Sequence, residues 1–254
     1  MKYIVLTFDD GLLDFKNNAI PILNKYKFKC TLAVVSGFSD KTVVTNREYI
    51  DNKDIFNFFK DGHDIALHSN RHLKEATPQD FEICKKKISK LLGISDFGLA
   101  VPYSNQLSDV FLDYFDKNDY LYVFDYKKKN KMNFKEKILF AINKFLKNEK
   151  IAFRISSRHY RYRTKSLLPK SNRIFRMPAT RKNNFEKIKY VVSKMKNNDC
   201  YTIMFHSIIN NVNDDCEWPG GAWTCFEFDL FLKYLSSKKD ICVLTQKELV
   251  RFGK

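Results

Sequence analysis

Short apolar runs alternate with helix-like segments along this 254-residue chain. The strand-like runs are residues 3–8, 31–35, 64–67, 99–102, 120–124, 201–205 and 241–244. Helical spacing or a helix start signal occurs between them, at residues 19–26, 52–60, 77–92, 109–115, 184–196 and 227–235. Alternation of this kind predicts an α/β fold with a mostly parallel sheet, either open or closed into a barrel.

Acidic and imidazole side chains stand directly after several of these apolar runs. Asp9, Asp10, His68 and His206 stand in this position, and His72 follows His68 four residues later. Taken singly, each has a simpler interpretation, as a turn or as a structural histidine. Because the carboxyl ends of parallel strands meet at one edge of a sheet, we expect the five side chains to converge there.

Two histidines and one carboxylate form a ligand set for a divalent cation such as zinc, and they leave positions open for water and for a substrate carbonyl. Such a cation lowers the pKa of its water and polarises the carbonyl. A second carboxylate, off the metal, can take the proton of the water. Cleavage of an amide also needs a proton for the leaving amine, which a histidine across the site can donate. The residue types therefore predict a metal-dependent hydrolase.

The motifs resemble those of the polysaccharide deacetylases, the carbohydrate esterase family four or NodB homology group. Thr-Phe-Asp-Asp-Gly stands at residues 7–11, and His-Ser-x-x-His stands at residues 68–72 after Gly-His-Asp-Ile at 62–65. A late motif of the Leu-x-His type resembles residues 203–206. The resemblance covers residues 3–249. It implies a distorted (β/α) barrel of about seven parallel strands, and we expect one domain over residues 1–254.

The resemblance also implies a role for each of the five side chains. Asp9 is expected to be the general base, and Asp10 to be the acidic metal ligand. His68 and His72 are expected to be the imidazole ligands, with zinc as the metal. His206 is expected to be the general acid.

A third family motif, usually Arg-x-Pro-Tyr-Gly, aligns with residues 100–104. Tyr103 is then expected to offer its backbone N–H to the tetrahedral oxyanion, as a further catalytic residue. The motif arginine, which orients the catalytic acid, is replaced by Ala100, and the glycine is replaced by Ser104. Arg176, on another strand-like run, is a candidate catalytic replacement for that guanidinium. The alternative is that Arg176 is an ordinary member of a basic surface.

Residues 127–176 carry 17 Lys or Arg against two acids, which gives this segment +15 of the chain's formal net charge of +16. We expect it to be a basic insertion on one rim of the domain, with an amphipathic helix at residues 134–146. Arginines alternate with His or Tyr at residues 158–163. The charge favours an anionic partner, and a solvated surface is the simplest alternative.

Three anionic partners compete for this segment. The first is an acidic or phosphate-linked glycan, which we favour because it fits the metal site. The second is an anionic inner-membrane surface, with residues 134–146 lying in the interface. The third is nucleic acid, which we disfavour because the sequence contains none of the motifs of that class.

Other features indicate the compartment. No apolar run reaches about 18 residues, and the first strand starts so early that no signal peptide is expected. The six cysteines lack CxxC spacing and are expected to be reduced thiols. We therefore expect a cytoplasmic protein, with peripheral contact to the inner membrane face as a variant of that expectation.

The expected function is removal of an N-acyl group, N-acetyl foremost, from a nucleotide- or lipid-linked precursor of a surface glycan. The alternative is a catalytically silent glycan-binding relative of the same fold. Ala100 favours that alternative, whereas the intact acids and histidines disfavour it. Trp218 and Trp223, on a Gly-rich loop, are expected either to stack on a sugar ring or to pack a lid.

Overall fold

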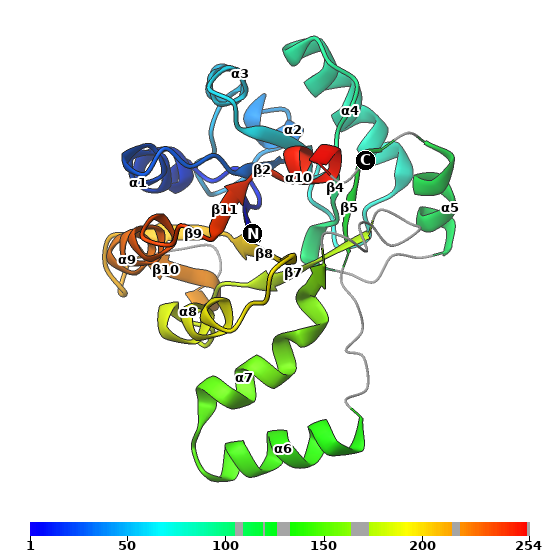
Figure 1. Ribbon diagram of the computed structural model, residues 1–254. Coiled ribbons are helices and arrows are strands. Elements are labelled where there is room, and N and C mark those ends of the chain that lie inside the picture. The colour runs from blue at the N-terminus through cyan, green and yellow to red at the C-terminus, as the bar shows by residue number, and fades with distance from the viewer. Residues whose placement is uncertain (105–108, 119, 126–132, 164–172, 215–218, 253–254) are drawn as a thin grey trace.

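Seven parallel strands close into a barrel surrounded by helices (Figure 1). The computed structural model describes residues 1–104, 109–118, 120–125, 133–163, 173–214 and 219–252. The barrel strands are β1 (Lys2–Phe8), β2 (Thr31–Val34), β3 (Asp64–Leu67), β4 (Leu99–Ala100), β5 (Val123–Asp125), β7 (Arg173–Pro178) and β8 (Asp199–Phe205). They follow one another in this order, and β8 pairs with β1 to close the ring. The predicted distorted barrel of about seven parallel strands is confirmed.

Two further strands distort the barrel. β11 (Ile241–Leu244) pairs in parallel with the first half of β1. β2 pairs with the last residues of β1 along the same edge. β6 (Arg161–Arg163) runs antiparallel along the start of β8. The predicted strand at residues 241–244 therefore exists but lies outside the ring, and β7 takes the seventh place. β9 (Ser207–Ile209) and β10 (Ala222–Thr224) form a separate two-stranded parallel sheet.

Most of the helices lie around the outside of the barrel (Figure 1). They are α1 (Ile20–Lys25), α2 (Ser36–Ser39), α3 (Asn52–Lys60), α4 (Pro78–Leu92), α5 (Asp109–Lys117), α6 (Phe134–Phe145), α7 (Glu149–Ser157), α8 (Phe185–Ser193), α9 (Cys225–Ser236) and α10 (Gln246–Phe252). α6 and α7 form a hairpin that projects from the barrel (Figure 1). The basic segment 127–176 contains this hairpin and β6, and its last residues lie in β7, in the barrel wall.

Local sequence explains where α4 begins and ends. The Thr77 side chain accepts a hydrogen bond from the backbone N–H of Asp80, and Pro78 occupies the first turn. The helix ends at Gly93, whose φ of 70° lies in the left-handed region that glycine tolerates best. This placement matters because the N-terminus of α4 supports the loop that follows β3.

An aromatic cluster fills the space between the barrel and the helices beside β8. Phe8 stacks on Phe205 with ring centroids 5.2 Å apart, and Trp223 meets Phe205 edge-on at 5.3 Å. Trp223 is 1% exposed, so the expectation that its indole stacks on a sugar ring is wrong. Its ring N–H donates to the carbonyl of Thr180, as a buried indole requires. Trp218 lies outside the described residues.

Cysteines and long apolar helices can be assessed for the described part of the chain. The five cysteines described there are free, and Cys216 lies outside it. Among the described helices, none combines the length and the apolar character that a bilayer-spanning segment requires.

Candidate active site

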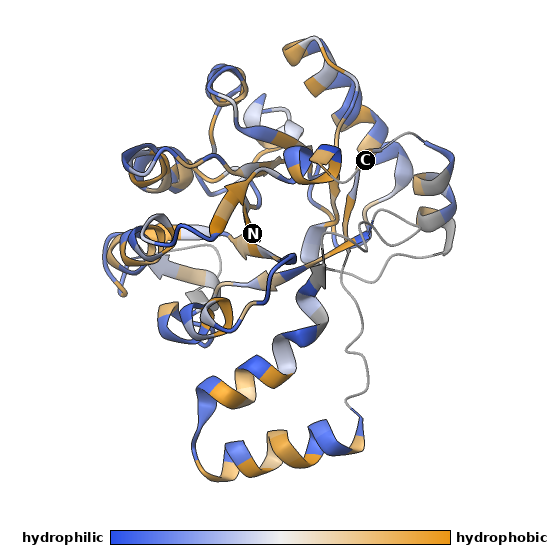
Figure 2. Ribbon diagram, viewed as in Figure 1, coloured by the Kyte–Doolittle hydropathy of each residue, from blue (hydrophilic) through white to orange (hydrophobic). Residues whose placement is uncertain are grey.

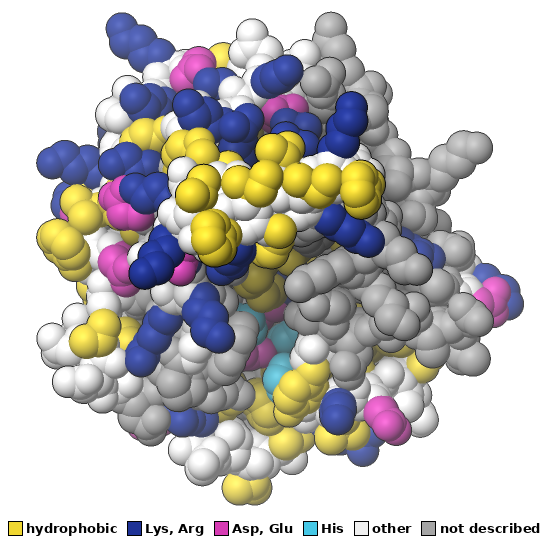
Figure 3. All heavy atoms as spheres, turned by 90° about the horizontal axis from the view of Figure 1, so that it is seen from below, with side chains coloured by type: hydrophobic (Ala, Val, Ile, Leu, Met, Phe, Trp, Pro, Cys, Tyr) yellow, Lys and Arg dark blue, Asp and Glu magenta, His cyan; other side chains and the backbone are white. Residues whose placement is uncertain are grey.

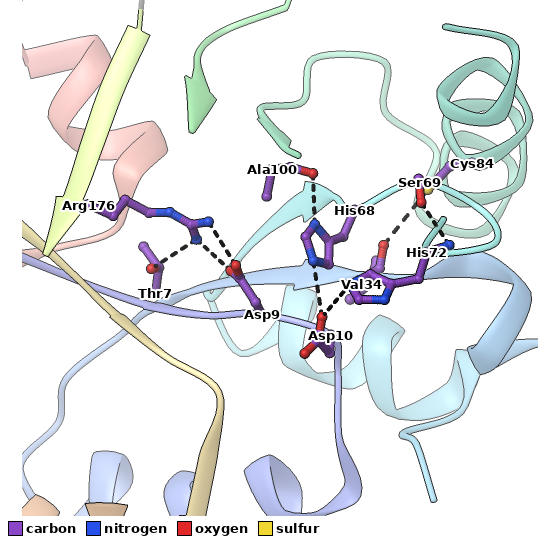
Figure 4. A network of polar contacts seen from close by, with 10 residues as sticks. All are labelled: Thr7, Asp9, Asp10, Val34, His68, Ser69, His72, Cys84, Ala100 and Arg176. Carbon is purple, nitrogen blue, oxygen red and sulfur yellow. Dashed lines mark hydrogen bonds and ion pairs between the residues drawn. The ribbon is translucent and has the colours of Figure 1, made fainter. Parts of the chain in front are cut away.

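Three side chains from two strand ends meet at the carboxyl edge of the barrel (Figure 4). Asp10 follows β1, and His68 and His72 lie in the loop after β3. The Asp10 Oδ1 atom is 3.0 Å from His68 Nε2 and 3.1 Å from His72 Nε2. One candidate ligand atom from each residue lies within 4.8 Å of the others. The sequence prediction that these three residues converge is confirmed.

The hydrogen bonds of His68 indicate why a cation suits this cluster. Its Nδ1 lies 2.7 Å from the carbonyl oxygen of Ala100, so Nδ1 carries the proton that is donated there. In the neutral ring, the lone pair of Nε2 then points at a carboxylate oxygen of Asp10, which is also electron-rich. A divalent cation or an added proton resolves that repulsion. The donor set of two imidazoles and one carboxylate fits a metal of the zinc type.

Electrostatics keep Asp10 ionised. Its side chain is buried, which alone raises the pKa of a carboxyl group, but hydrogen bonds to His68 and His72 hold the pKa of Asp10 well below its usual value. Conversely, burial lowers the pKa of His68, but the contact with Asp10 outweighs burial and raises it. Asp10 is therefore available as an anionic ligand at neutral pH.

Asp9, the neighbour of Asp10, has a different partner. Both of its carboxylate oxygens accept hydrogen bonds from the guanidinium of Arg176, at 2.5 and 2.7 Å. Burial raises the pKa of Asp9, but the charge of Arg176 outweighs burial and leaves the pKa below its ordinary value. The geometry is the bidentate pairing that a planar guanidinium allows and a lysine does not.

Arg176 reaches Asp9 from β7, which is separated from β1 in the barrel by β8 alone (Figure 4). Its side chain is buried, and its guanidinium carbon lies 4.3 Å from the centre of the Phe124 ring on β5. A second contact, at 3.4 Å, joins it to the Thr7 hydroxyl. The structure thus places Arg176 inside the site. The alternative, that it is an ordinary member of a basic surface, does not hold.

His206 stands beside the aspartates because β8 closes the barrel against β1. Phe205 lies opposite Phe8 in the register of the two strands, and the Asp9 N–H donates to the Phe205 carbonyl at 3.0 Å. His206 follows immediately, is half-buried, and interacts electrostatically with both Asp9 and Asp10. All five sequence-predicted acids and histidines therefore gather at one edge.

Tyr103 lies on the open side of this cluster. Its ring is 60% exposed, and its centroid is 4.8 Å from that of His72. Both residues line a hollow of about 570 Å³ that also reaches Tyr49, Arg47 and Arg71. Aromatic faces and cationic side chains at the rim of a metal-type site suit an anionic, ring-shaped ligand.

Unusual backbone geometry marks the same region. Four non-glycine residues there have left-handed φ angles: Asp10 (76°), Ser69 (66°), His72 (53°) and Tyr103 (58°). Side chains bearing a Cβ rarely adopt this conformation, and each occurrence costs of order 1 kcal/mol or more. Such residues gather at functional sites, where the position of a side chain matters more than the stability of the backbone.

Sequence reasoning missed the residue that holds the histidine loop. The Asp80 carboxylate, 1% exposed, accepts hydrogen bonds from the backbone N–H groups of Asn70 and Arg71 at 3.0 and 3.2 Å. It also accepts a hydrogen bond from the Arg71 side chain at 2.9 Å. The only sequence signal was an acid in the first turn of a helix, which ordinarily serves the helix alone.

The fold and the site together define a (β/α)-barrel protein with a candidate metal centre at the carboxyl edge of its strands. Residues 1–123 match the family described as polysaccharide deacetylase. The resemblance drawn from the motifs is thereby confirmed over residues 1–123. No curated protein sequence matches the chain.

Solved structures of this architecture cover nearly the whole chain. The Puue allantoinase has a TM-score of 0.61 at 9% identity, covering 98% of this chain and 89% of its own. A family 4 acetyl xylan esterase from Clostridium thermocellum, solved with a cobalt ion, has a TM-score of 0.56 at 18% identity, covering 98% and 91%. Peptidoglycan deacetylase PdaC from Bacillus subtilis has a TM-score of 0.52 at 15% identity, covering 99% and 92%. At such identities the likeness establishes the fold.

Proposed function

We propose that this protein is a metal-dependent hydrolase that removes an N-acyl group, N-acetyl foremost, from a carbohydrate. The meeting of Asp10 with the Nε2 atoms of His68 and His72 carries the proposal. The match of residues 1–123 to the polysaccharide deacetylases supports the carbohydrate substrate and the deacetylation. Zinc is the metal we propose, because two imidazoles and a carboxylate are among its usual ligands.

The roles of the side chains follow from what each one contacts. When bound by Asp10, His68 and His72, the cation supplies Lewis acidity to a water molecule and to the amide carbonyl. Asp9, held ionised by Arg176, takes the proton from the attacking water.

Two further residues complete the reaction. His206, which follows β8 and interacts with both aspartates, donates a proton to the nitrogen of the leaving amine. The N–H of Tyr103 donates to the oxyanion that forms on the carbonyl oxygen. Arg176 is a positioning residue in this scheme, since it orients Asp9 and keeps it ionised without contacting the amide.

The substrate we propose is an anionic, phosphate-linked N-acetyl sugar, bound through a nucleotide or a lipid. The hollow beside His72 supports this choice, because Tyr49 and Tyr103 offer aromatic faces and Arg47 adds positive charge. A cytoplasmic location is part of the proposal, since precursors of surface glycans are made there. Fractionation of cells tests the location separately.

Acetate release is the direct test. Purified protein loaded with zinc is incubated with N-acetylated sugar nucleotides, polyprenyl-linked N-acetyl sugars and neutral N-acetylated oligosaccharides. We expect release of acetate from a phosphate-linked substrate, and its loss on chelation and recovery on re-addition of zinc. Asp9→Asn is expected to retain zinc and lose turnover by at least about 100-fold, within the range for loss of a general base.

The silent glycan-binding alternative makes the opposite prediction. Under that alternative, the protein binds the glycan with or without metal and releases no acetate from any member of the panel. Normal zinc content in both His68→Ala and His72→Ala would remove the ligand assignment and, with it, the hydrolase proposal.

A further inference from the structure

One face of α6 is apolar and exposed, and no described residue covers it. Its six side chains are 43–87% exposed: Phe134, Ile138, Leu139, Ile142, Phe145 and, directly after the helix, Leu146. None of the residues of α6 is buried. Figure 2 shows the hydrophobic positions along the helix, and Figure 3 shows them as a continuous ridge on the surface. We call these six side chains the α6 ridge.

The ridge is held outward by a well-supported hairpin. α6 packs against α7, and its half-buried residues, Glu136, Phe140 and Asn143, recur at the spacing of one helix face. Arg158, just after α7, donates to the Glu136 carboxylate at 3.0 Å. A capping box between Asn133 and Glu136 starts α6. Helix α6 therefore has its own start signal and its own partner, and neither uses the ridge.

The second helix of the hairpin joins it to the barrel layer. Ala152 and Ile155 on α7 are buried, and α7 packs against α8. Ion pairs connect the same two helices, with Lys150 2.9 Å from Glu186. The apolar face of α6 is thus presented on a fixed support that continues through β6 into the sheet.

Positive charge accompanies the ridge. The exposed lysines of α6 and its following turn are Lys135, Lys137, Lys144 and Lys147, whereas its single acid, Glu136, is turned toward Arg158. Figure 3 shows Lys and Arg side chains gathered beside the ridge. An apolar face flanked by lysines is the composition of helices that lie in the interface of an anionic bilayer.

Charge also argues against the other occupants of such a face. A second copy of this chain would bring a like charge of +16 against the same lysines. A nucleic acid would satisfy the lysines but would leave six apolar side chains without a partner. An anionic phospholipid surface satisfies both the apolar and the cationic side chains.

The candidate active site opens on the same face of the molecule. Figure 3 shows a hollow beside the ridge, with histidine and acidic side chains at its bottom. We propose that α6 docks this protein onto an anionic phospholipid bilayer and so presents the site to a carbohydrate carried by a lipid. The substrate half of this proposal rests on the proposed deacetylase function, and the docking half does not.

Vesicle sedimentation tests the docking. Wild-type protein is mixed with vesicles of phosphatidylcholine alone or of phosphatidylcholine with phosphatidylglycerol, in the presence of EDTA. We expect partition onto the anionic vesicles only, weakened by 0.5 M NaCl. The double variant Ile142→Asp/Phe145→Asp is expected to lose at least about tenfold in partition, since it places carboxylates in the interface. Lys137→Glu/Lys144→Glu is expected to do the same.

A matched control lies on α9. Phe226 is 70% exposed and away from α6 in the chain, so Phe226→Asp is expected to sediment like wild type. Equal sedimentation of the ridge variant and wild type would overturn the proposal, and so would failure of wild type to bind anionic vesicles. A wild-type dimer that the ridge variant converts to a monomer, without vesicle binding, would assign the ridge to self-association instead.

The two proposals fail independently. Sedimentation in EDTA needs neither metal nor turnover, so a protein without deacetylase activity can still dock. If the protein is an active deacetylase, the ridge variant is expected to keep wild-type turnover on a water-soluble substrate and to lose turnover on a lipid-linked substrate in vesicles. Equal turnover of the two proteins on the vesicle-borne substrate would overturn the delivery role.

Discussion

At the scale of single residues, two adjacent aspartates differ in function because they face different neighbours. Asp9 meets a guanidinium and Asp10 meets two imidazoles, although one peptide bond joins them. The left-handed φ of Asp10, 76°, turns the chain at this point, and Gly11 follows with a φ of 75°. The Asp-Asp-Gly sequence is therefore a turn that separates a candidate base from a candidate ligand.

Arg176 provides the first prediction at this scale. Arg176→Gln removes the charge that offsets the burial of Asp9, so the pKa of Asp9 should rise and the fraction of ionised base at neutral pH should fall. We expect turnover to drop about 100-fold at pH 7, with the activity profile displaced to higher pH and with zinc content unchanged. Arg176→Lys should recover part of the loss.

Zinc analysis and a pH–rate profile check this prediction. An unchanged rate and profile in Arg176→Gln would return the arginine to a structural role. If Arg176→Gln loses both zinc and the circular dichroism of the folded chain, the Arg176–Asp9 pair serves folding. In that case Arg176→Lys is not expected to recover turnover.

The sequence identified the residues of the site but left some of their partners open. The fivefold pattern of Asp9, Asp10 and three histidines was visible because each stands at a strand end or shortly after one. The pairing of Arg176 with Asp9 was only one of two alternatives, because the two residues are far apart in the chain and Arg176 stands in a segment crowded with other basic residues. The contact of Asp80 with the histidine loop was hidden for another reason, since an acid in the first turn of a helix ordinarily serves the helix alone.

His63 gives a pH prediction. The backbone N–H of Cys30 donates to His63 Nδ1 at 3.3 Å, and burial lowers the pKa of His63 from 6.5 to about 4. Between pH 6.5 and pH 4, His63 therefore takes up a proton more readily in the unfolded chain than in the folded chain. The free energy of unfolding is unaffected by this residue above pH 6.5. It decreases by up to about 3 kcal/mol as the pH falls from 6.5 toward 4.

Denaturation in urea between pH 7 and pH 4.5 measures this effect. His63→Gln stays neutral throughout, so its free energy of unfolding should fall less steeply with acid than that of wild type. Parallel pH dependences for the two proteins would mean that His63 protonates freely in the folded state.

At the scale of elements, the N-terminus of α4 serves as a clamp on the loop after β3. The Asp80 carboxylate binds the backbone of that loop, and the Thr77 hydroxyl caps the same helix end by accepting from the Asp80 N–H. The loop carries both histidine ligands and two left-handed residues. The helix thus offsets the conformational cost of the backbone that the ligand cluster requires.

Asp80→Asn is predicted to weaken zinc binding by about tenfold, because supporting residues around metal ligands typically contribute 10–100-fold to affinity. Thr77→Ala is the matched control, since it should cost about 1 kcal/mol of stability through the lost cap and leave zinc affinity unchanged. Competition with a chelating dye measures both affinities. Equal affinities in wild type and Asp80→Asn would reduce Asp80 to an ordinary helix-end acid.

The elements themselves were predictable to different degrees. Apolar strands such as β1 and β3 stood out in the sequence, since both are buried along their whole length or nearly so. β7 did not enter the predicted series of barrel strands, because Arg173 and Arg176 interrupt its apolar pattern. β11 was predicted as a strand. The sequence cannot show that β11 pairs with the first half of β1 while β2 pairs with its end, along the same edge.

At the scale of the whole molecule, closure of the barrel assembles the site. β1 pairs with β8, so residues near the start of the chain lie beside His206. The ligands Asp10 and His68 come from strands separated in the ring by β2. A cation bound by these residues would therefore link parts of the barrel that are far apart in the chain, and no such site exists in the unfolded chain.

Removal of metal should consequently lower the stability of the whole barrel. A ligand that binds only the folded chain adds about 2.7 kcal/mol at a free concentration of 100 times its Kd. For a chain of this size, we expect zinc to raise the Tm by about 5–10 °C over the protein in EDTA. His72→Ala should show no difference between the two conditions, because it removes one ligand from a half-buried loop position. A zinc-dependent rise in Tm that persists in His72→Ala would place the stabilising ion elsewhere on the molecule.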